Sequence, residues 1–446
     1  MPSTVFDSAI FRDAFGTEAM RRVFSDEAMV AAHVEVEVAL AKVQGRLGVI
    51  PAGAANDIAA TADASRIDLA QLKQKTDIVG YPIVGLVAQL GRQCGEAGRY
   101  LHWGATTQDV MDTGLVLQMR QAFDLVAGDL AALDAALVRL ARDHRMTVMA
   151  GRTHLQQALP ITFGYKAAVW LSMLRRHRER LGQMLPRILV GQFAGAAGTL
   201  ASLGDKGLAV SDALMDELGL ARPDIPWHVS RDGPAEAVSF LALVTGTLAK
   251  IATDVMLMMQ TEIGEAFEPF EEGRGSSSTM PQKRNPIACE FIIAAAKVVR
   301  QQVGLMLDGM VADHERATGP WQAEWVALPQ AFIAASGAFK HARFMLEGLV
   351  VDAGRMRQNL GVTGGLIVAE AVMMAFADKV GRQEAHHIVY AACRKALEAG
   401  TTLLSELQKL PEVTRHLPPE RLAELTDPVN YLGSAPAMVD RVLSRA

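Results

Sequence analysis

The chain has 446 residues, of which 50% are hydrophobic and only 6% aromatic, and its formal net charge is −5. A basic surface that neutralises nucleic-acid phosphates is therefore not expected, and three widely spaced cysteines indicate neither a disulfide framework nor a metal cluster. The N-terminal residues show no basic segment followed by an apolar one, as a secretory signal would. Charged residues also interrupt every span of about 20 residues. We therefore expect a soluble cytoplasmic protein without a membrane segment.

The first predicted long element is a helix over residues 26–47. Apolar side chains recur there at helical spacing, and Gly48 with Pro51 ends the run. The irregular segment 100–109 later breaks the helical pattern, and its Thr and Asp residues can cap a long helix over about 109–145. We therefore predict a domain boundary at this break.

Four further stretches keep an apolar stripe for longer than the average helix of about 11–12 residues. They are 160–187, 233–268, 286–312 and 327–349. With the helix that follows residue 109, they predict a central bundle of about five long helices. Gly-rich joints at 191–204 and 271–278 supply permissive backbone where chemistry can be placed.

The predicted fold is all-α, with three helical domains. These are an N-terminal helical domain (1–99), a central long-helix bundle that carries the motifs (100–352) and a small C-terminal helical domain (353–446), whose helices are punctuated by prolines. Long helices that are apolar on more than one face cannot bury themselves in a single bundle, so we expect a homo-oligomer. The alternative is that these helices form the interior of a large monomer.

A chemically distinctive run begins at Gly275. Residues 275–286 read Gly-Ser-Ser-Ser-Thr-Met-Pro-Gln-Lys-Arg-Asn-Pro, so hydroxyl-bearing residues precede two cations and an amide. Flexible backbone supplies N–H donors, Lys283 and Asn285 can hold carboxylate oxygens, and a serine hydroxyl can be placed against a reacting carbon. Composition alone favours an ordinary Gly/Ser linker.

The run 277–286 resembles the signature of the fumarase/aspartase superfamily, and the order of three motif regions along the whole chain is similar to that of the family. The resemblance implies a homotetramer with active sites shared between subunits, a small dicarboxylate substrate and no cofactor or metal. It implies that Ser277, as an alkoxide, abstracts the proton β to the leaving group. It also implies substrate contacts from Ser278, Met280, Lys283 and Asn285.

Two other motif regions follow the same resemblance. Residues 104–109 resemble the Thr/Ser-rich loop that binds a substrate carboxylate, which makes Thr106, Thr107 and Gln108 candidate contacts. Thr106 and Asp109 can also cap the following helix. His102 is either a residue of the same pocket or a structural histidine.

Residues 151–160 resemble the histidine motif of the family, which implies that His154 is the acid/base partner and that Thr153 lies beside the substrate. Imidazole suits this role because its ordinary pKa of about 6.5 allows proton transfer near neutrality. In the family a glutamate after the serine loop orients this histidine, and Glu290 stands in the matching place. Alone, the two residues would be a helix-cap histidine and a solvated glutamate. Gln260 and Arg316 are secondary candidates for substrate contacts, weighed evenly against solvated helix positions.

Outside these motifs the chain most resembles the 3-carboxy-cis,cis-muconate cycloisomerase branch, in segments 100–114, 314–325 and 427–433. Bacterial cycloisomerases lack the histidine and the glutamate, whereas this chain has both His154 and Glu290. A positioned acid helps to expel an amine or similar group, while a carboxylate leaving group needs little proton assistance. The pair therefore favours a lyase that releases fumarate by β-elimination from a succinyl-type substrate through an aci-carboxylate intermediate. The alternative is a lactonising cycloisomerase.

Three other readings are disfavoured. Adenylosuccinate lyase resembles the chain in the serine loop and at 314–316, but Trp325 stands where that enzyme has a phosphate-binding arginine, which argues against a purine nucleotide. Argininosuccinate lyase resembles the serine loop but not segment 321–325. A structural role of the kind played by lens crystallins related to the superfamily is disfavoured because the serine, lysine, histidine and glutamate are intact.

Overall fold

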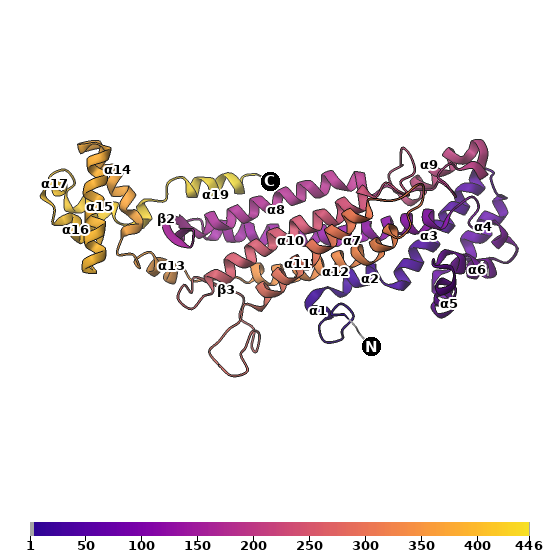
Figure 1. Cartoon of the computed structure of the whole chain (residues 1–446), viewed down its shortest axis with the longest axis horizontal. Coiled ribbons are helices and arrows are strands. Elements are labelled where there is room, and N and C mark those ends of the chain that lie inside the picture. The colour runs from indigo at the N-terminus through magenta and orange to yellow at the C-terminus, as the bar shows by residue number, and fades with distance from the viewer. Residues whose placement is uncertain (1–3, 446) are drawn as a thin grey trace. The chain divides into compact units, whose positions relative to one another are not determined.

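The computed structural model describes residues 4–445, so residues 1–3, on which part of the N-terminal prediction rests, lie outside it. The described chain is mostly helical, and its strands form two small antiparallel pairs (Figure 1). It divides into two compact units. Within the described residues, unit 1 comprises 4–130, His177–Ala249 and Phe291–His341, and unit 2 comprises Ala131–Arg176, Lys250–Glu290 and 342–445.

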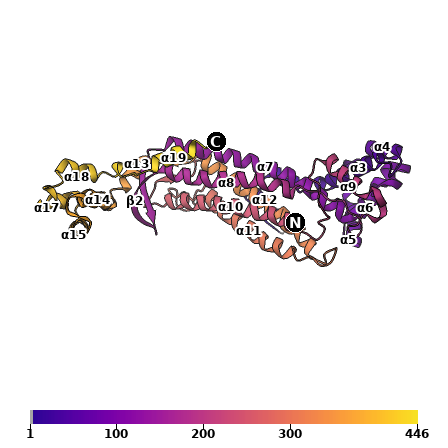
Figure 2. The ribbon, with the colours of Figure 1, turned by 90° about the horizontal axis from the view of Figure 1, so that it is seen from above.

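Five long helices contribute residues to both units, and within each unit their segments run side by side (Figures 1 and 2). In unit 1 the Phe123 ring packs edge-on against Phe332 at 4.9 Å between centroids. In unit 2 Trp170 Nε1 donates a hydrogen bond to Asp254 at 2.9 Å. The predicted set of long helices is therefore present as α7 (Thr107–Asp143), α8 (Phe163–Ile188), α10 (Asp232–Met258), α11 (Ile287–Gly309) and α12 (Pro320–Glu347).

Two boundaries of these helices differ by seven residues or more from the predictions. The helix predicted to continue to residue 268 ends at Met258. The chain then turns through Gly264, which has a left-handed φ of 60°, and enters strand β3 (Ala266–Phe267). Helix α12 begins at Pro320 instead of 327. Proline suits this position because the first turn of a helix does not use its backbone N–H groups.

The helix predicted over residues 26–47 is confirmed as α3 (Asp26–Arg46). The Ser25 hydroxyl accepts a hydrogen bond from the Ala28 N–H at its start, and Gly48 adopts a left-handed φ of 65° beyond its end. The shorter α-helices in the described part of unit 1 are α1 (Arg12–Phe15), α2 (Glu18–Val23), α4 (Ala52–Thr61), α5 (Leu69–Val79), α6 (Ile83–Cys94) and α9 (Gly207–Leu218).

A β-hairpin in unit 2 was not predicted. Strands β1 (Val148–Thr153) and β2 (Gln156–Thr162) pair antiparallel, and the predicted helix start at 160 therefore lies inside β2. The connection is only two residues long, and both His154 and Leu155 have positive φ, 51° and 63°. Such turns usually contain Asn and Gly, so this hairpin lacks the ordinary sequence signal.

The C-terminal part of unit 2 consists of short helices around their own core, as the prolines predicted. Buried Val372, Phe376, Leu403 and Leu422 belong to this core, and prolines occupy the first turns of α17, α18 and α19. The division into three domains stays a prediction. The elements are β4 (Val350–Val351), α13 (Ala353–Asn359), α14 (Ala369–Val380), α15 (Arg382–Ala399), α16 (Leu403–Gln408), α17 (Pro411–Thr414), α18 (Pro419–Leu425) and α19 (Ala435–Leu443).

Helix α10 has the length and apolar composition of a membrane-spanning helix. However, Val238, Leu241 and Val244 on this helix are completely buried against other helices. These residues place part of its apolar surface in the core of unit 1.

Candidate active site

The first motif region lies at the start of α7, in unit 1. The Thr106 N–H donates to Asp109 Oδ2 at 2.9 Å, so Asp109 caps this helix as the sequence allowed. The same carboxylate accepts hydrogen bonds from the N–H groups of Ala194 and Gly195, at 3.0 and 2.9 Å, and lies 2.7 Å from His228 Nε2. Asp109 therefore ties the motif loop to the Gly-rich joint.

Gln108 is completely buried and its amide is fully engaged. Nε2 donates to Asp112 Oδ2 at 3.0 Å and to the His228 carbonyl at 2.9 Å, while Oε1 accepts from Arg316 Nη1 at 3.0 Å. Arg316 also donates to the Ala196 carbonyl at 2.8 Å. The structure thus brings Gln108 and Arg316 together, and this geometry favours Gln108 as a positioning residue for the arginine. Thr106 and Thr107 are half-buried beside it.

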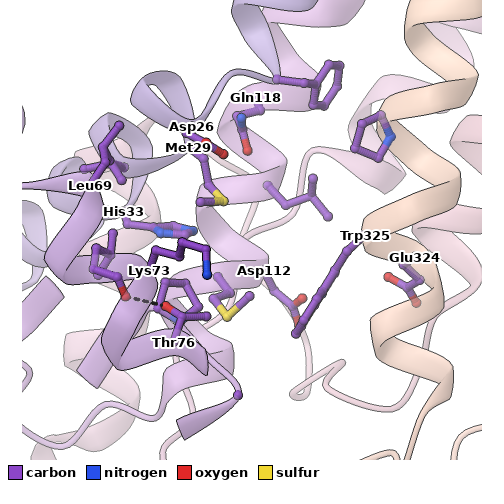
Figure 3. A pocket seen from close by; sticks show the side chains of 18 of the residues that line it. Asp26, Met29, His33, Leu69, Lys73, Thr76, Asp112, Gln118, Glu324 and Trp325 are labelled. Carbon is purple, nitrogen blue, oxygen red and sulfur yellow. Dashed lines mark hydrogen bonds between the residues drawn. The ribbon is translucent and has the colours of Figure 1, made fainter. Parts of the chain in front are cut away.

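Behind the motif lies an ion network that sequence reasoning missed. The Arg231 guanidinium contacts Asp112 at 2.7 Å and Glu324 at 2.6 Å, and all three side chains are 1% exposed. Burial opposes the charge on Arg231, but the two carboxylates outweigh it and raise the pKa of Arg231. Burial raises the pKa of Glu324 although Arg231 opposes it. Two of these residues lie in segments that carried the resemblance, Asp112 in 100–114 and Glu324 in 314–325 (both labelled in Figure 3).

His102 is paired with the carboxylate of Glu37 on α3, a residue that the sequence analysis did not identify. His102 Nδ1 lies 2.6 Å from Glu37 Oε1, and the His102 backbone N–H donates to Oε2 at 3.1 Å. The Glu37 side chain has no solvent exposure. Burial acts to lower the pKa of His102, but the hydrogen bond and charge of Glu37, with the charge of Asp109, raise it overall. The raised pKa favours the protonated form of the ring, which is the form that binds anions.

The histidine motif of unit 2 sits on the β1–β2 hairpin. His154 is exposed at the tip, where a left-handed residue other than glycine costs roughly 1–2 kcal/mol. Below the tip, Arg152 makes a two-pronged ion pair with buried Glu265 at 2.7 and 2.8 Å, and Asn359 donates to the same carboxylate at 2.8 Å. The contacts of Glu265 therefore hold the strands just below the turn in place, while the turn itself has strained backbone. Strained backbone held by its surroundings is typical of functional sites. Thr153 is exposed next to the tip.

The serine loop, residues 273–285, lies between β3 and α11 in unit 2 and leaves the helices as a long excursion in Figure 1. Its ends are joined because the Asn285 N–H donates to the Gly275 carbonyl at 2.8 Å. Gly275 has a φ of 67°, and a Cβ there would lie 2.5 Å from the Asn285 carbonyl oxygen, so this close approach requires glycine.

The Ser277 hydroxyl oxygen accepts hydrogen bonds from two N–H groups of its own loop. Its Oγ accepts hydrogen bonds from the backbone N–H groups of Thr279, at 3.3 Å, and Met280, at 3.1 Å. Donors that point at an oxygen stabilise its anionic form, so this geometry suits a serine that acts as an alkoxide. Lys283 is exposed and makes no ion pair with any residue of the described chain.

The remaining predicted residues of unit 2 are also accessible. Ser278, Met280 and Gln260 are exposed and Asn285 is half-buried. Glu290 is exposed in the first turn of α11. The start of that helix is fixed by Glu268, whose carboxylate accepts hydrogen bonds from the N–H groups of Ala288 and Cys289, at 3.2 and 2.8 Å.

The predicted site residues therefore form two sets. Unit 1 contains His102, Thr106, Thr107, Gln108 and Arg316, and unit 2 contains Thr153, His154, Gln260, Ser277, Ser278, Met280, Lys283, Asn285 and Glu290. Among residues 4–445 there is no group of three or more His, Cys, Asp or Glu residues arranged to hold a metal ion.

Two family profiles match the chain. The profile described as "Lyase" matches residues 12–300, and the profile described as "Adenylosuccinate lyase C-terminus" matches residues 365–442. Together they span the motif regions and the short C-terminal helices.

Full-length relatives have different activities. The chain is 48% identical to trans-aconitate decarboxylase 1 of Mycosarcoma maydis, covering 100% of this chain and 90% of that protein. It is 46% identical to the 3-carboxy-cis,cis-muconate cycloisomerase of Pseudomonas aeruginosa, covering 99% and 97%. It is 42% identical to the N-acetyl-S-(2-succino)cysteine lyase of Dickeya dadantii, covering 100% and 98%.

Solved structures share the fold over the whole chain. A fumarate lyase from Mesorhizobium sp. BNC1 is 53% identical with a TM-score of 0.92, covering 97% of this chain and 99% of that chain. The 3-carboxy-cis,cis-muconate lactonizing enzyme from Pseudomonas putida is 42% identical with a TM-score of 0.93, covering 98% of each chain.

Proposed function

This chain belongs to the fumarase/aspartase superfamily of lyases, and we propose that it catalyses β-elimination from a substituted succinate with release of fumarate. The observation that carries the proposal is the Ser277 loop. Two backbone N–H groups point at Oγ, and the cation Lys283, which forms no ion pair within residues 4–445, lies in the same loop. A base and the groups that stabilise the charge it creates are thus supplied together.

In the first step the Ser277 alkoxide removes a proton from the carbon next to one substrate carboxylate. The electron pair of the broken C–H bond moves into that carboxylate and gives a dianionic aci-carboxylate. Lys283, Asn285 and the loop N–H groups stabilise this charge. In the second step the electron pair returns to form the C=C bond of fumarate, and the C–X bond breaks with its electrons leaving on X.

His154 supplies a proton to the departing group X, with Glu290 as the residue that orients it. Support comes from the hairpin, which exposes His154 while Arg152 and Glu265 hold the base of the turn rigid. An acid at this point matters when X is an amine or a thiol, because these groups leave poorly as anions. The relative that acts on N-acetyl-S-(2-succino)cysteine is consistent with such a leaving group.

We propose that the site is completed by neighbouring subunits of a homotetramer. The motif residues of unit 2 are largely exposed in the single chain, and the bundle helices also carry exposed apolar side chains that a subunit interface would cover, among them Val169, Leu243, Leu307 and Val326. Co-refolding the inactive Ser277→Ala and His154→Asn variants tests this sharing. Recovery of activity in the mixture supports it, and an active monomer contradicts it.

A second candidate is 3-carboxy-cis,cis-muconate cycloisomerase activity. It is favoured by the 46% identity to the Pseudomonas aeruginosa cycloisomerase and by the TM-score of 0.93 to the Pseudomonas putida lactonizing enzyme. The same serine and anion-binding loop would serve it. Its carboxylate leaving group would leave His154 without a required role.

A substrate panel separates these functions. Amino-, thio- and nitro-substituted succinates, 3-carboxy-cis,cis-muconate and trans-aconitate would each be given to the purified protein, with Ser277→Ala as the background. Fumarate formation, read by its absorbance, supports the elimination. Lactone formation from the muconate without fumarate from any succinate supports the second candidate, and turnover of trans-aconitate alone overturns both.

A further inference from the structure

The serine loop is closed at its base by a neck that consists of residues 274–276 and 284–285, all in unit 2. Ser276 and Arg284 form an isolated antiparallel bridge there, next to the backbone hydrogen bond that joins the two ends of the loop. Ser277 follows directly along the chain. The position of its hydroxyl group therefore depends on the position of the neck.

Arg274 joins one side of the neck to helix α12. Its guanidinium carbon lies 3.9 Å from the centroid of the Phe344 ring, well inside the limit of about 6 Å for a cation–π contact. The Arg274 side chain is 24% exposed, and its Nε atom is buried without a hydrogen-bond partner among the described residues. The contact is therefore partly shielded from water, which strengthens the attraction between cation and ring.

An ion pair does not account for the position of Arg274. The carboxylate that is paired with it, Glu271, lies 3.7 Å from Nη1, beyond hydrogen-bonding distance, and the Glu271 side chain is 57% exposed. Water screens such a pair, so it contributes little to holding the arginine. The half-buried ring of Phe344 is the better shielded partner.

The ring that receives Arg274 belongs to a well-packed part of unit 2. Phe344 lies in the last turn of α12, and Gly348 follows the end of that helix. Pro269 packs so closely on Gly348 that a Cβ there would lie 2.7 Å from Pro269 Cγ. Strand β3, just before Pro269, pairs with strand β4, just after Gly348. The chain that leads to Arg274 is thus fixed to the end of α12.

The arginine on the other side of the neck has a weaker contact. The Arg284 guanidinium carbon lies 5.1 Å from the centroid of Phe270, and that ring is 70% exposed. Arg284 Nη2 also donates to the Glu268 carbonyl at 3.2 Å. Cation–π contacts are weaker where water reaches them. The stack of Arg274 on Phe344 is therefore the stronger attachment of the loop.

We propose that Arg274 is a positioning residue for Ser277, and that its stack on Phe344 restricts the serine loop to conformations in which the reacting groups act together. The restriction of the loop does not depend on the reaction, but its catalytic consequence rests on the proposed elimination. A displacement of about 1 Å in a reacting group can lower turnover about 10²-fold. Loss of the stack should therefore both loosen the loop and slow the reaction.

Limited proteolysis with endoproteinase Lys-C measures the restriction without a substrate. Lys283 is the only lysine in the sequence from 273 to 285, and it is exposed. Cleavage after Lys283 requires local opening of the loop, so its rate reports how often the loop opens. Cleavage after Lys297, inside α11, requires that helix to unfold and provides an internal reference.

Arg274→Met and Phe344→Leu should each raise the cleavage rate after Lys283 about tenfold relative to that after Lys297. Phe344→Tyr keeps the ring and Glu271→Gln removes only the distant carboxylate, so both should stay within about twofold of wild type. Unchanged rates in Arg274→Met and Phe344→Leu would overturn the proposal. An equal increase in Glu271→Gln would also overturn it, because the ion pair would then hold the loop.

Turnover tests the positioning role. On a substrate from the panel, Arg274→Met and Phe344→Leu should each lower kcat about tenfold or more, and the double variant should lose little beyond either one. Faster cleavage after Lys283 with unchanged kcat would overturn the positioning role. If wild type turned over no compound of the panel, the proposed elimination would fail, whereas the Lys-C rates would still decide whether Arg274 holds the loop.

Discussion

Gln108, Asp109 and Asp112 at the start of α7 are buried, and their side chains hydrogen-bond to several partners. Ser277 and Lys283 in the serine loop are half-buried or exposed, and the contacts of Ser277 are local. Both segments carry motif residues of the superfamily. The start of α7 therefore holds its polar side chains in place through hydrogen bonds, whereas the serine loop leaves its candidate reacting groups accessible to a ligand.

This difference predicts how each segment responds to substitution. Removing one partner from a buried ion pair leaves an uncompensated charge and costs about 3–5 kcal/mol. An exposed position usually changes stability by no more than about 0.5 kcal/mol. Variants of the α7 network should therefore lose stability, and variants of the serine loop should lose activity alone.

The largest effect is expected for Ser277→Ala. Loss of the proposed base should lower kcat by about 10²–10⁴-fold, with an unchanged melting temperature because the side chain makes only local contacts. Steady-state kinetics and thermal denaturation measure the two. Ser276→Ala, whose hydroxyl donates only to the Gly273 carbonyl, is the matched control and should stay active. Turnover of Ser277→Ala within about tenfold of wild type would mean that another group is the base.

Arg231→Leu should show the opposite behaviour. It leaves Asp112 and Glu324 buried without their cation, so the free energy of unfolding should fall by about 3–5 kcal/mol. Urea denaturation measures this loss. Arg222→Leu, at a half-exposed arginine paired with Asp216, is the control and should change stability far less, because water screens an exposed ion pair. Equal losses in the two variants would contradict the contrast between buried and exposed pairs.

Glu37→Gln should produce a smaller and pH-dependent loss. The raised pKa of His102 means that its pairing with Glu37 stabilises the fold fully below about pH 6.5 and less as the pH rises through the folded pKa. Removing the charged partner should cost about 1.5–3 kcal/mol at pH 6, and the difference from wild type should shrink toward pH 9. Denaturation across this pH range measures it. The exposed Glu35→Gln on the same helix should give a small difference at every pH.

The smallest expected effect is an increase in stability. Leu155 is 78% exposed and has a φ of 63° at the hairpin tip, so Leu155→Gly should relieve backbone strain and stabilise the protein by about 0.5–1 kcal/mol. Thermal denaturation would show this as a small rise in melting temperature. A loss of stability would mean that Leu155 makes contacts in the assembled protein that are worth more than the strain.

Most of the helical framework was predictable from the sequence because its signals are local. An apolar stripe, Gly48 with Pro51 after the helix over 26–47 and the prolines that punctuate the C-terminal region each act within a few residues. The β1–β2 hairpin was not predicted because His154 and Leu155 occupy turn positions that usually contain Asn and Gly. The candidate serine and histidine segments were found by motif order.

What the sequence by itself determined is therefore the set of long helices, the membership of the superfamily and the identity of the motif residues. Only the tertiary structure decided which carboxylate pairs with which arginine or histidine. His102 meets Glu37 across 65 positions, Arg152 meets Glu265 across 113, and Arg231 meets Asp112 across 119. No local periodicity specifies such pairs, because they form only when burial makes an unpaired charge too costly and packing brings its partner within hydrogen-bonding distance.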